Sequence, residues 1–212
     1  VPGVFIVRPE TELLAGLAID EAGAIVRERG EARVVDLCTG SGAIAFAVAL
    51  EAASTEVWAV EKEADPFALA CRNRDLVGAC RVHLERADAT ALTTLSHLDA
   101  MVDVVVTNPP YVPGDEMPTQ PEASADPHVA LYGGSSDGTA IPVRIIRRAR
   151  TLLRPGGTLL MEHSPSQDAA LRKYAHSAGF VDVETLPDLA GRARFLRARA
   201  PRSTKPTASV TQ

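Results

Sequence analysis

The chain has 212 residues, a formal net charge of −5 and 46% hydrophobic residues. This composition is typical of a folded globular protein, and the length suits one α/β domain rather than two. The longest uninterrupted apolar run is residues 43–50, whereas a membrane-spanning helix needs about 20 apolar residues, so we expect no membrane association. The three cysteines have no CxxC spacing, which argues against a disulfide framework and favours a cytoplasmic location.

Short β-rich runs alternate with amphipathic stretches along most of the chain. In chain order we predict a helix at 10–28, a strand at 33–37, a helix at 41–52, a strand at 56–61, a helix at 65–77, strands at 81–85 and 102–107, a helix at 140–153, a strand at 158–162, a helix at 167–177, and strands at 181–186 and 194–198. This alternation predicts a mostly parallel seven-stranded sheet with helices on both faces, a Rossmann-like α/β fold. The link before the final strand is too short for a crossover helix, so that strand should run antiparallel.

The predicted domain occupies residues 1–200, in which residues 1–30 form an N-terminal motif and a helix that lead into the sheet. Residues 112–139 form a long loop rich in proline and glycine, and a loop of that length in a compact domain is typically functional or disordered. Residues 201–212 are rich in Ser, Thr and Pro, and we predict a disordered tail there.

A glycine-rich loop follows the first predicted strand and opens a helix. Five residues form its centre: Cys38, Thr39, Gly40, Ser41 and Gly42. Glycines at such a turn let a nucleoside cofactor approach the main chain. Glu61 ends the second strand, where a carboxylate can accept hydrogen bonds from two ribose hydroxyls. The pattern fits any nucleoside cofactor, so an NAD-dependent oxidoreductase is one open alternative.

The charges near this loop favour S-adenosylmethionine over NAD. The pyrophosphate of NAD prefers helix amides without a nearby anion, whereas S-adenosylmethionine carries a sulfonium and an ammonium. Asp36 lies just before the loop and suits such a cationic ligand. Asp88 and Ala89 follow the third strand, where the Asp88 carboxylate can accept a hydrogen bond from the adenine amine. A solvated turn residue is the simpler alternative for Asp88.

Asn108, Pro109, Pro110 and Tyr111 follow the apolar strand at 102–107. In a doubly wound sheet, residues at the carboxyl end of a strand face the ligand. The Asn108 side-chain oxygen and the Pro109 carbonyl can accept both hydrogens of an –NH2 group, while Tyr111 can stack on a planar substrate. Because a sulfonium is already an activated leaving group, orientation is the main contribution required of the protein. We interpret the segment as the catalytic centre of a methyltransferase acting on a planar nitrogen.

The tetrapeptide at 108–111 resembles the (N/D/S)-P-P-(Y/F/W) motif of methyltransferases that act on DNA adenine, ribosomal RNA or glutamine. Residues 4–14, Val-Phe-Ile-Val-Arg-Pro-Glu-Thr-Glu-Leu-Leu, resemble the opening of the HemK/PrmC catalytic domain. Further similarity lies in residues 121–122, 126–131, 133–138, 153–157 and 188–192. The HemK/PrmC family methylates the glutamine side-chain amide in the Gly-Gly-Gln motif of peptide-chain release factors.

The resemblance implies a protein-(glutamine-N5) methyltransferase that uses S-adenosylmethionine and releases S-adenosylhomocysteine. It implies that the cofactor binds at residues 38–42, Glu61, Asp88 and Asn108, and that residues 108–111 hold the glutamine. The implied partner is a release factor, with no direct nucleic-acid contact, and we expect a monomer.

The resemblance also places four residues beside the methyl-transfer site: Arg8, Pro9, Glu10 and Thr11. Helix capping alone is the alternative explanation for that segment. The chain departs from the family pattern at Val7, where proline is usual, at Cys38, where glycine is usual, and at Asp126, where glutamate is common. The helical N-terminal domain of the family is absent from this chain, so the resemblance covers the catalytic domain.

A second alternative is an adenine N6-methyltransferase acting on RNA or DNA, which would use the same tetrapeptide. Such an enzyme should show a strong basic groove, which the acidic net charge disfavours. Arginines do cluster in the sequence, at 144–154 and again at 192–202, and we interpret both clusters as solvated surface. The histidines show no metal-ligand spacing, so we predict no metal site.

Overall fold

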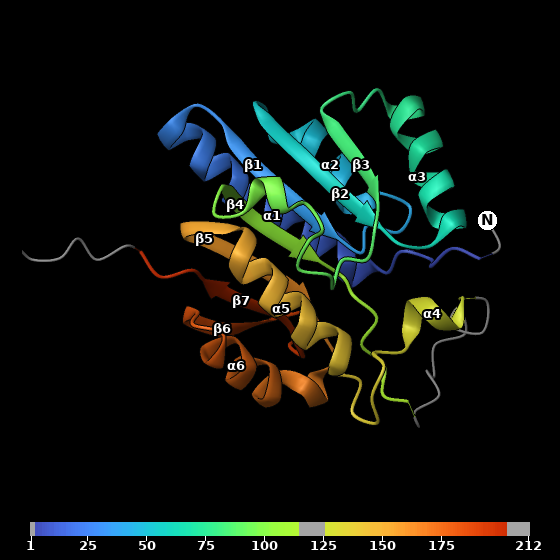
Figure 1. Cartoon of the computed structure of the whole chain (residues 1–212), viewed down its shortest axis with the longest axis vertical. Helices are drawn as coiled ribbons and strands as arrows, with labels where there is room; N and C mark the ends of the chain where they lie inside the picture. Colours follow the sequence, from blue (N-terminus) through green and yellow to red (C-terminus); the bar gives the residue numbers. More distant parts are fainter. Residues whose placement is uncertain (1–2, 115–125, 203–212) are drawn as a thin grey trace, which may run out of the picture.

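A seven-stranded sheet forms the centre of the computed structural model, which describes residues 3–114 and 126–202 (Figure 1). The strands are β1 (Ala32–Leu37), β2 (Thr55–Glu61), β3 (Val82–Arg86), β4 (Val102–Thr107), β5 (Leu153–Glu162), β6 (Val181–Pro187) and β7 (Ala193–Arg199). Their order across the sheet is β3-β2-β1-β4-β5-β7-β6. Strands β1 to β5 pair in parallel, whereas β7 pairs antiparallel with β5 and β6. The predicted fold class is therefore confirmed.

Helices cover both faces of this sheet (Figure 1). One face carries α1 (Pro9–Arg29), α2 (Ala43–Glu51) and α3 (Ala64–Val77). The other face carries η1 (Ser96–Leu98), α5 (Ala140–Leu152) and α6 (Asp168–Ser177). Besides η1, two more short helical segments were not predicted from the sequence: α4 (His128–Leu131) and η3 (Pro165–Gln167), in the connections after β4 and β5.

The hydrophobic core consists of two layers separated by the sheet. Every residue of β4 is buried, and from Val104 to Val106 its side chains alternate between the two layers. Val104 and Val106 belong to the layer beneath α1 and α2, whereas Val105 belongs to the layer beneath α5 and α6. Because β4 is buried on both faces, its sequence is an almost continuous run of valines rather than an alternating pattern.

The boundary between α5 and β5 differs from its predicted position. We predicted a helix to residue 153 and a strand only from 158, but β5 begins at Leu153, which pairs with Val102 of β4. Gly157 allows this early pairing, because a Cβ atom there would lie 3.0 Å from the carbonyl oxygens of Val102 and Asp103. The close approach of two backbones is a tertiary feature that propensity alone does not indicate.

The prediction that the arginine clusters are solvated surface is wrong for Arg148. This side chain is fully buried, donating from Nε to the Thr94 carbonyl (2.8 Å) and from Nη2 to Asp99 Oδ1 (2.7 Å). Several arginines near the C-terminus form ion pairs: Arg192 with Glu10 and Asp188, Arg197 with Glu184, and Arg199 with Glu21. These cations therefore pair within the chain and do not line a free basic groove.

Some expectations lie partly outside the described residues. Residues 115–125 of the predicted long loop and residues 203–212 of the predicted tail are among these. Within residues 3–114 and 126–202, no helix combines the length and apolar character needed to cross a membrane.

The turn between β1 and α2 depends on the absence of a side chain at Gly42. Gly42 has φ 88°, a left-handed conformation that other residues adopt at a cost. A Cβ atom there would also lie 2.1 Å from Cε2 of the buried Phe46. Gly30, at the end of α1, has nearly the same φ of 87°, but a Cβ atom there would contact nothing within 4 Å.

We therefore expect Gly30→Ala to lower the free energy of unfolding by about 1–2 kcal/mol, the cost of the left-handed backbone. Gly42→Ala should lower it by at least about 2 kcal/mol more, since Phe46 must also leave its position in the core. Urea unfolding of both variants measures the difference. Equal losses would show that Phe46 does not constrain the loop.

Candidate active site

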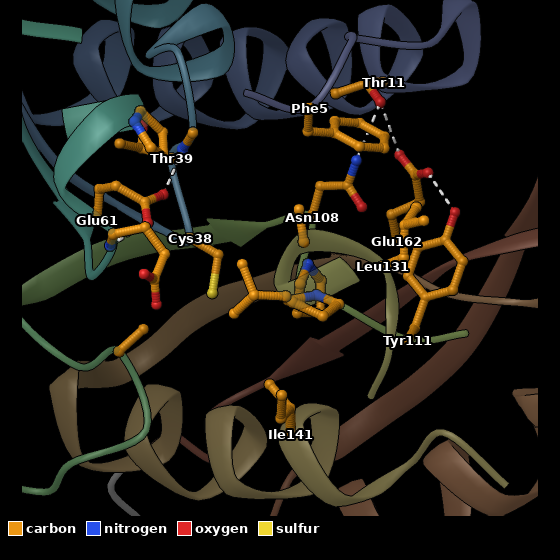
Figure 2. A pocket seen from close by; sticks show the side chains of 18 of the residues that line it. Phe5, Thr11, Cys38, Thr39, Glu61, Asn108, Tyr111, Leu131, Ile141 and Glu162 are labelled. Carbon is orange, nitrogen blue, oxygen red and sulfur yellow. Dashed lines mark hydrogen bonds between the residues drawn. The ribbon is translucent and has the colours of Figure 1, made fainter. Parts of the chain in front are cut away.

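A cavity of about 470 Å³ opens at the carboxyl ends of the five parallel strands, β1 to β5 (Figure 2). The predicted site residues in its wall are Arg8, Glu10, Thr11, Cys38, Thr39, Gly40, Ser41, Glu61, Asp88, Ala89, Asn108, Pro109, Pro110 and Tyr111. Three others, Pro9, Asp36 and Gly42, are described by the structure but are not part of this wall. The fold thus brings segments from five strand ends, and from the start of α1, to one cavity.

The carboxylate of Glu61 is fixed at one end of the cavity by main-chain groups. Gly40 N–H donates to Glu61 Oε2 (2.9 Å), and Glu63 N–H donates to Oε1 (2.8 Å). Burial raises the pKa of Glu61, while these two hydrogen bonds act in the opposite direction. Each carboxylate oxygen retains lone-pair capacity, so the group can accept two further hydrogen bonds from a neighbouring diol.

Three N–H groups of the glycine loop form hydrogen bonds within the chain. Besides the bond from Gly40, Thr39 N–H donates to the Val60 carbonyl (2.9 Å) and Gly42 N–H donates to the Thr39 carbonyl (2.9 Å). A pyrophosphate would require such groups to point at the ligand. Those three groups are therefore not available to a pyrophosphate, and the neighbouring Glu61 carboxylate favours a neutral or cationic group over an anion.

Asp36 lies behind the loop, where it stabilises the turn. Its side chain is fully buried and accepts a hydrogen bond from the Thr39 hydroxyl (2.6 Å). Its Oδ1 atom has no hydrogen-bond partner in the part of the chain that the structure describes. Burial raises the pKa of Asp36 to about 7, against the opposing effect of the Thr39 hydroxyl. The structure therefore gives Asp36 a bracing position, without direct access to the cavity.

Asp88 stands at the same end of the cavity in a turn after β3. Its Oδ1 atom accepts hydrogen bonds from the N–H (2.8 Å) and the hydroxyl (2.7 Å) of Thr90. Burial raises the pKa of Asp88, but the bonds from Thr90 and the charge of Lys62 outweigh it, so the pKa is lowered overall. The carboxylate is thus ionised, and its second oxygen, 4.0 Å from Lys62 Nζ, can accept from a ligand.

A chain of hydrogen bonds joins four side chains at the other end of the cavity (Figure 2). Asn108 Nδ2 donates to Thr11 Oγ1 (3.1 Å), and Thr11 Oγ1 donates to Glu162 Oε2 (3.1 Å). Tyr111 donates its hydroxyl hydrogen to Glu162 Oε1 (2.9 Å). Burial raises the pKa of Tyr111, which therefore remains a neutral phenol. The asparagine and the tyrosine of the tetrapeptide are thus tied to one buried carboxylate.

Glu162 and Gln167 were not among the predicted site residues. Glu162 ends the buried strand β5 next to β4, so a carboxylate after an apolar strand was the available signal. Gln167 Nε2 donates to the carbonyls of Tyr111 (2.7 Å) and Asp137 (2.8 Å). Gly138 lies against the same segment, because a Cβ atom there would be 2.2 Å from the Tyr111 carbonyl oxygen. Gln167 and Gly138 therefore fix the backbone after the two prolines.

The segment before α1 forms another part of the cavity wall. The Arg8 guanidinium pairs with Asp126 and lies 4.9 Å from the centroid of the Phe5 ring. Ile6 N–H donates to Asp126 Oδ1 (2.9 Å). Aspartate at 126 thus serves as the anchor for this segment, and Phe5, together with Leu131 and Ile141, gives the cavity an apolar region (Figure 2).

Comparisons with known proteins agree with this geometry. A sequence model described as a methyltransferase domain matches residues 28–186. The chain is 47% identical over 205 residues to the release factor glutamine methyltransferase of Bifidobacterium longum, with 92% of this chain and 68% of that protein covered. It is 44% identical over 201 residues to the protein of the same name from Streptomyces coelicolor, with 93% and 69% covered.

Solved structures share the fold at low sequence identity. A methyltransferase from Pyrococcus furiosus superposes with a TM-score of 0.66 at 17% identity, covering 95% of this chain and 87% of the other. A ribosomal protein L11 methylase from Lactobacillus delbrueckii gives a TM-score of 0.63 at 19% identity, covering 92% and 81%. These two likenesses show the fold.

The raised pKa of Asp36 leads to a prediction about stability. The folded protein holds this proton up to pH about 7, whereas an unfolded chain releases it at about pH 4. The contribution of Asp36 to the free energy of unfolding is therefore greatest below about pH 4 and decreases as the pH rises towards 7. Relative to Asp36→Asn, the free energy of unfolding of the wild type should fall by about 1.4 kcal/mol per pH unit across that window.

Urea unfolding of both proteins at several pH values measures this difference. Parallel stability curves for the wild type and Asp36→Asn would mean that Asp36 titrates normally in the folded protein.

Proposed function

The chain belongs to the family of release factor glutamine methyltransferases, and we propose that it transfers a methyl group from S-adenosylmethionine to the side-chain amide of the glutamine in the Gly-Gly-Gln motif of a release factor. The observation that carries the proposal is the placement of Asn108. Its carboxamide lines the cavity between the glycine loop and the apolar region, and Thr11 holds its –NH2 end.

The residues present fit the methyl donor at one end of the cavity. The fixed Glu61 carboxylate suits the two ribose hydroxyls, and the ionised Asp88, next to Ala89, suits the adenine amine. The loop at 38–42, braced by Asp36, suits the sulfonium and the ammonium of the methionine portion, because its surroundings are acidic. When bound, S-adenosylmethionine supplies an electrophilic methyl carbon on a sulfonium.

At the other end, the chain's own groups orient the nucleophile. The Asn108 side-chain oxygen and the Pro109 carbonyl accept the two amide hydrogens of the glutamine. Accepting those hydrogens raises the electron density on a nitrogen whose lone pair is otherwise delocalised. Tyr111, held through its hydroxyl by Glu162, lies beside the planar amide. Orientation and exclusion of water in this half-apolar cavity are then the main catalytic contributions.

The structure disfavours both alternatives. An NAD-dependent oxidoreductase would place a pyrophosphate beside the loop, where the carboxylates of Asp36 and Glu61 disfavour an anion. An adenine N6-methyltransferase needs free cations for phosphates. The arginines of the C-terminal hairpin instead pair with carboxylates of this chain.

We further propose that residues 1–200 act as a monomeric catalytic domain in the cytoplasm, with the release factor as protein partner. The three cysteines are free thiols, which is consistent with a reducing compartment.

Glu61→Gln should weaken binding of S-adenosylmethionine by about 10- to 100-fold, because the variant loses a charged acceptor for the ribose hydroxyls. Isothermal titration calorimetry measures the dissociation constant directly. Glu56→Gln, at the opposite end of β2, is the matched control and should bind as the wild type does. Equal affinities for Glu61→Gln and Glu56→Gln would remove Glu61 from the cofactor site.

Mass spectrometry of a release factor incubated with the protein and S-adenosylmethionine tests the reaction. We expect one added methyl on the Gly-Gly-Gln peptide, and a loss of at least about 100-fold in kcat/KM for Asn108→Ala, which removes the oriented acceptor. Absence of methylation by a wild-type protein that binds S-adenosylmethionine would contradict the proposed substrate.

A further inference from the structure

Glu162 belongs to the hydrogen-bonded chain but has no assigned part in holding cofactor or glutamine. Its side chain is buried at the end of β5, with 1% of the residue exposed. Both of its oxygens accept hydroxyl hydrogens, one from Thr11 and one from Tyr111. Burying a carboxylate is unfavourable, and these two hydrogen bonds offset the loss of hydration. Because the carboxylate is bound to two residues of the site, we expect it to have a role in the reaction.

The direction of each hydrogen bond follows from the chemistry of the groups. An ionised carboxylate has no hydrogen to give, so the Thr11 hydroxyl must donate its single hydrogen to Glu162. The Thr11 oxygen then offers Asn108 only lone pairs, and these accept from the –NH2 end of the carboxamide. The opposite end of that carboxamide, its oxygen, is thereby turned away from Thr11.

The two ends of an asparagine side chain have nearly the same shape, so packing alone does not choose between them. If Glu162 became a donor to Thr11, the Thr11 hydroxyl hydrogen would be free to point at Asn108. The side-chain oxygen of Asn108 would then face Thr11, and the –NH2 group of Asn108 would face the –NH2 group of the substrate amide. Both of these groups are hydrogen-bond donors, so they could not bind each other.

We infer that Glu162 is a positioning residue, which acts through Thr11 to present the Asn108 side-chain oxygen to the substrate nitrogen. The inference rests on the proposed function for the identity of that nitrogen. The same carboxylate fixes the Tyr111 ring through its hydroxyl, so one buried acceptor orients both ends of the tetrapeptide.

This arrangement requires ionised Glu162, and its charged neighbours act in opposite directions. Arg194 favours the ionised form, and Glu10 disfavours it. Burial raises the pKa of Glu162, while the hydroxyls of Tyr111 and Thr11 lower it. Methyl transfer should therefore fall on the acidic side of the pH profile as Glu162 takes up a proton, and Glu162→Gln should lack that limb.

Substitution of Thr11 tests the link between Glu162 and Asn108. Thr11→Val keeps the shape but removes the hydroxyl, and kcat should fall by about 30-fold or more while the dissociation constant for S-adenosylmethionine changes little. Thr11→Ser restores the hydroxyl and should recover most of the lost kcat. Equal activity of Thr11→Val and Thr11→Ser would overturn the inference.

A double-mutant cycle tests the direction of the bonds. Asn108→Asp alone places a carboxylate next to the Thr11 lone pairs, so that two acceptors face each other. Glu162→Gln alone removes the charged acceptor of the Thr11 hydroxyl. Each single substitution should lower kcat by about 30-fold or more. In the double variant, the amide that replaces the Glu162 carboxylate can donate to Thr11. The Thr11 hydrogen is then free for the carboxylate that replaces the Asn108 carboxamide.

The double variant should therefore be at least about tenfold more active than the product of the single losses predicts. Additive or larger losses, in proteins that still bind S-adenosylmethionine, would overturn the inference.

A readout without methyl transfer separates this inference from the proposed function. The Asn108 side-chain –NH2 signal in NMR spectra should show one hydrogen-bonded proton in the wild type, and this feature should be lost in Thr11→Val and kept in Thr11→Ser. If the wild type failed to methylate a release factor, the proposed substrate would be wrong, but the NMR signal would still report the orientation of the Asn108 carboxamide. An unchanged signal in Thr11→Val would contradict the inferred orientation.

Discussion

The site exists because the sheet reverses its direction of growth between β1 and β4. From β1 the chain adds β2 and β3 on one side, whereas β4 and β5 are added on the other. The loops that leave β1 and β4 therefore diverge and open a crevice at the carboxyl edge, where ligands bind in doubly wound sheets. The glycine loop after β1 and the tetrapeptide after β4 face this crevice, and every other feature of the site depends on this topology.

Three buried carboxylates lie in or behind the wall of this crevice, and each accepts hydrogen bonds from groups of the chain. Asp36 accepts from a hydroxyl and braces the loop, Glu61 accepts from two main-chain N–H groups, and Glu162 accepts from two hydroxyls. Burial raises the pKa of all three, so each costs stability at neutral pH. Several buried carboxylates that lower the stability of the fold at one place are typical of a functional site, and are not expected in a core that serves stability alone.

The sequence was sufficient to predict the fold, and most of the predicted site residues do lie in the cavity wall, because these features depend on local signals. The valines of β4, the glycines after β1 and the prolines after β4 each indicate their own conformation. Features that depend on distant partners were not predictable. Arg148 was predicted to be solvated, but its guanidinium is buried and donates hydrogen bonds to the Thr94 carbonyl and to Asp99. Likewise, the part of Glu162 becomes visible only when α1 brings Thr11, 151 residues away in sequence, to its side.

In the proposed reaction, Asn108 presents its side-chain oxygen to a glutamine amide beside the methyl donor. A crystal structure with S-adenosylhomocysteine and a peptide containing Gly-Gly-Gln would show the position of that oxygen directly. We expect the glutamine amide to lie within hydrogen-bond distance of Asn108 Oδ1 and the Pro109 carbonyl, with Thr11 still hydrogen-bonded to both Asn108 and Glu162. A glutamine bound away from Asn108, or a carboxamide turned with its –NH2 group towards the peptide, would contradict it.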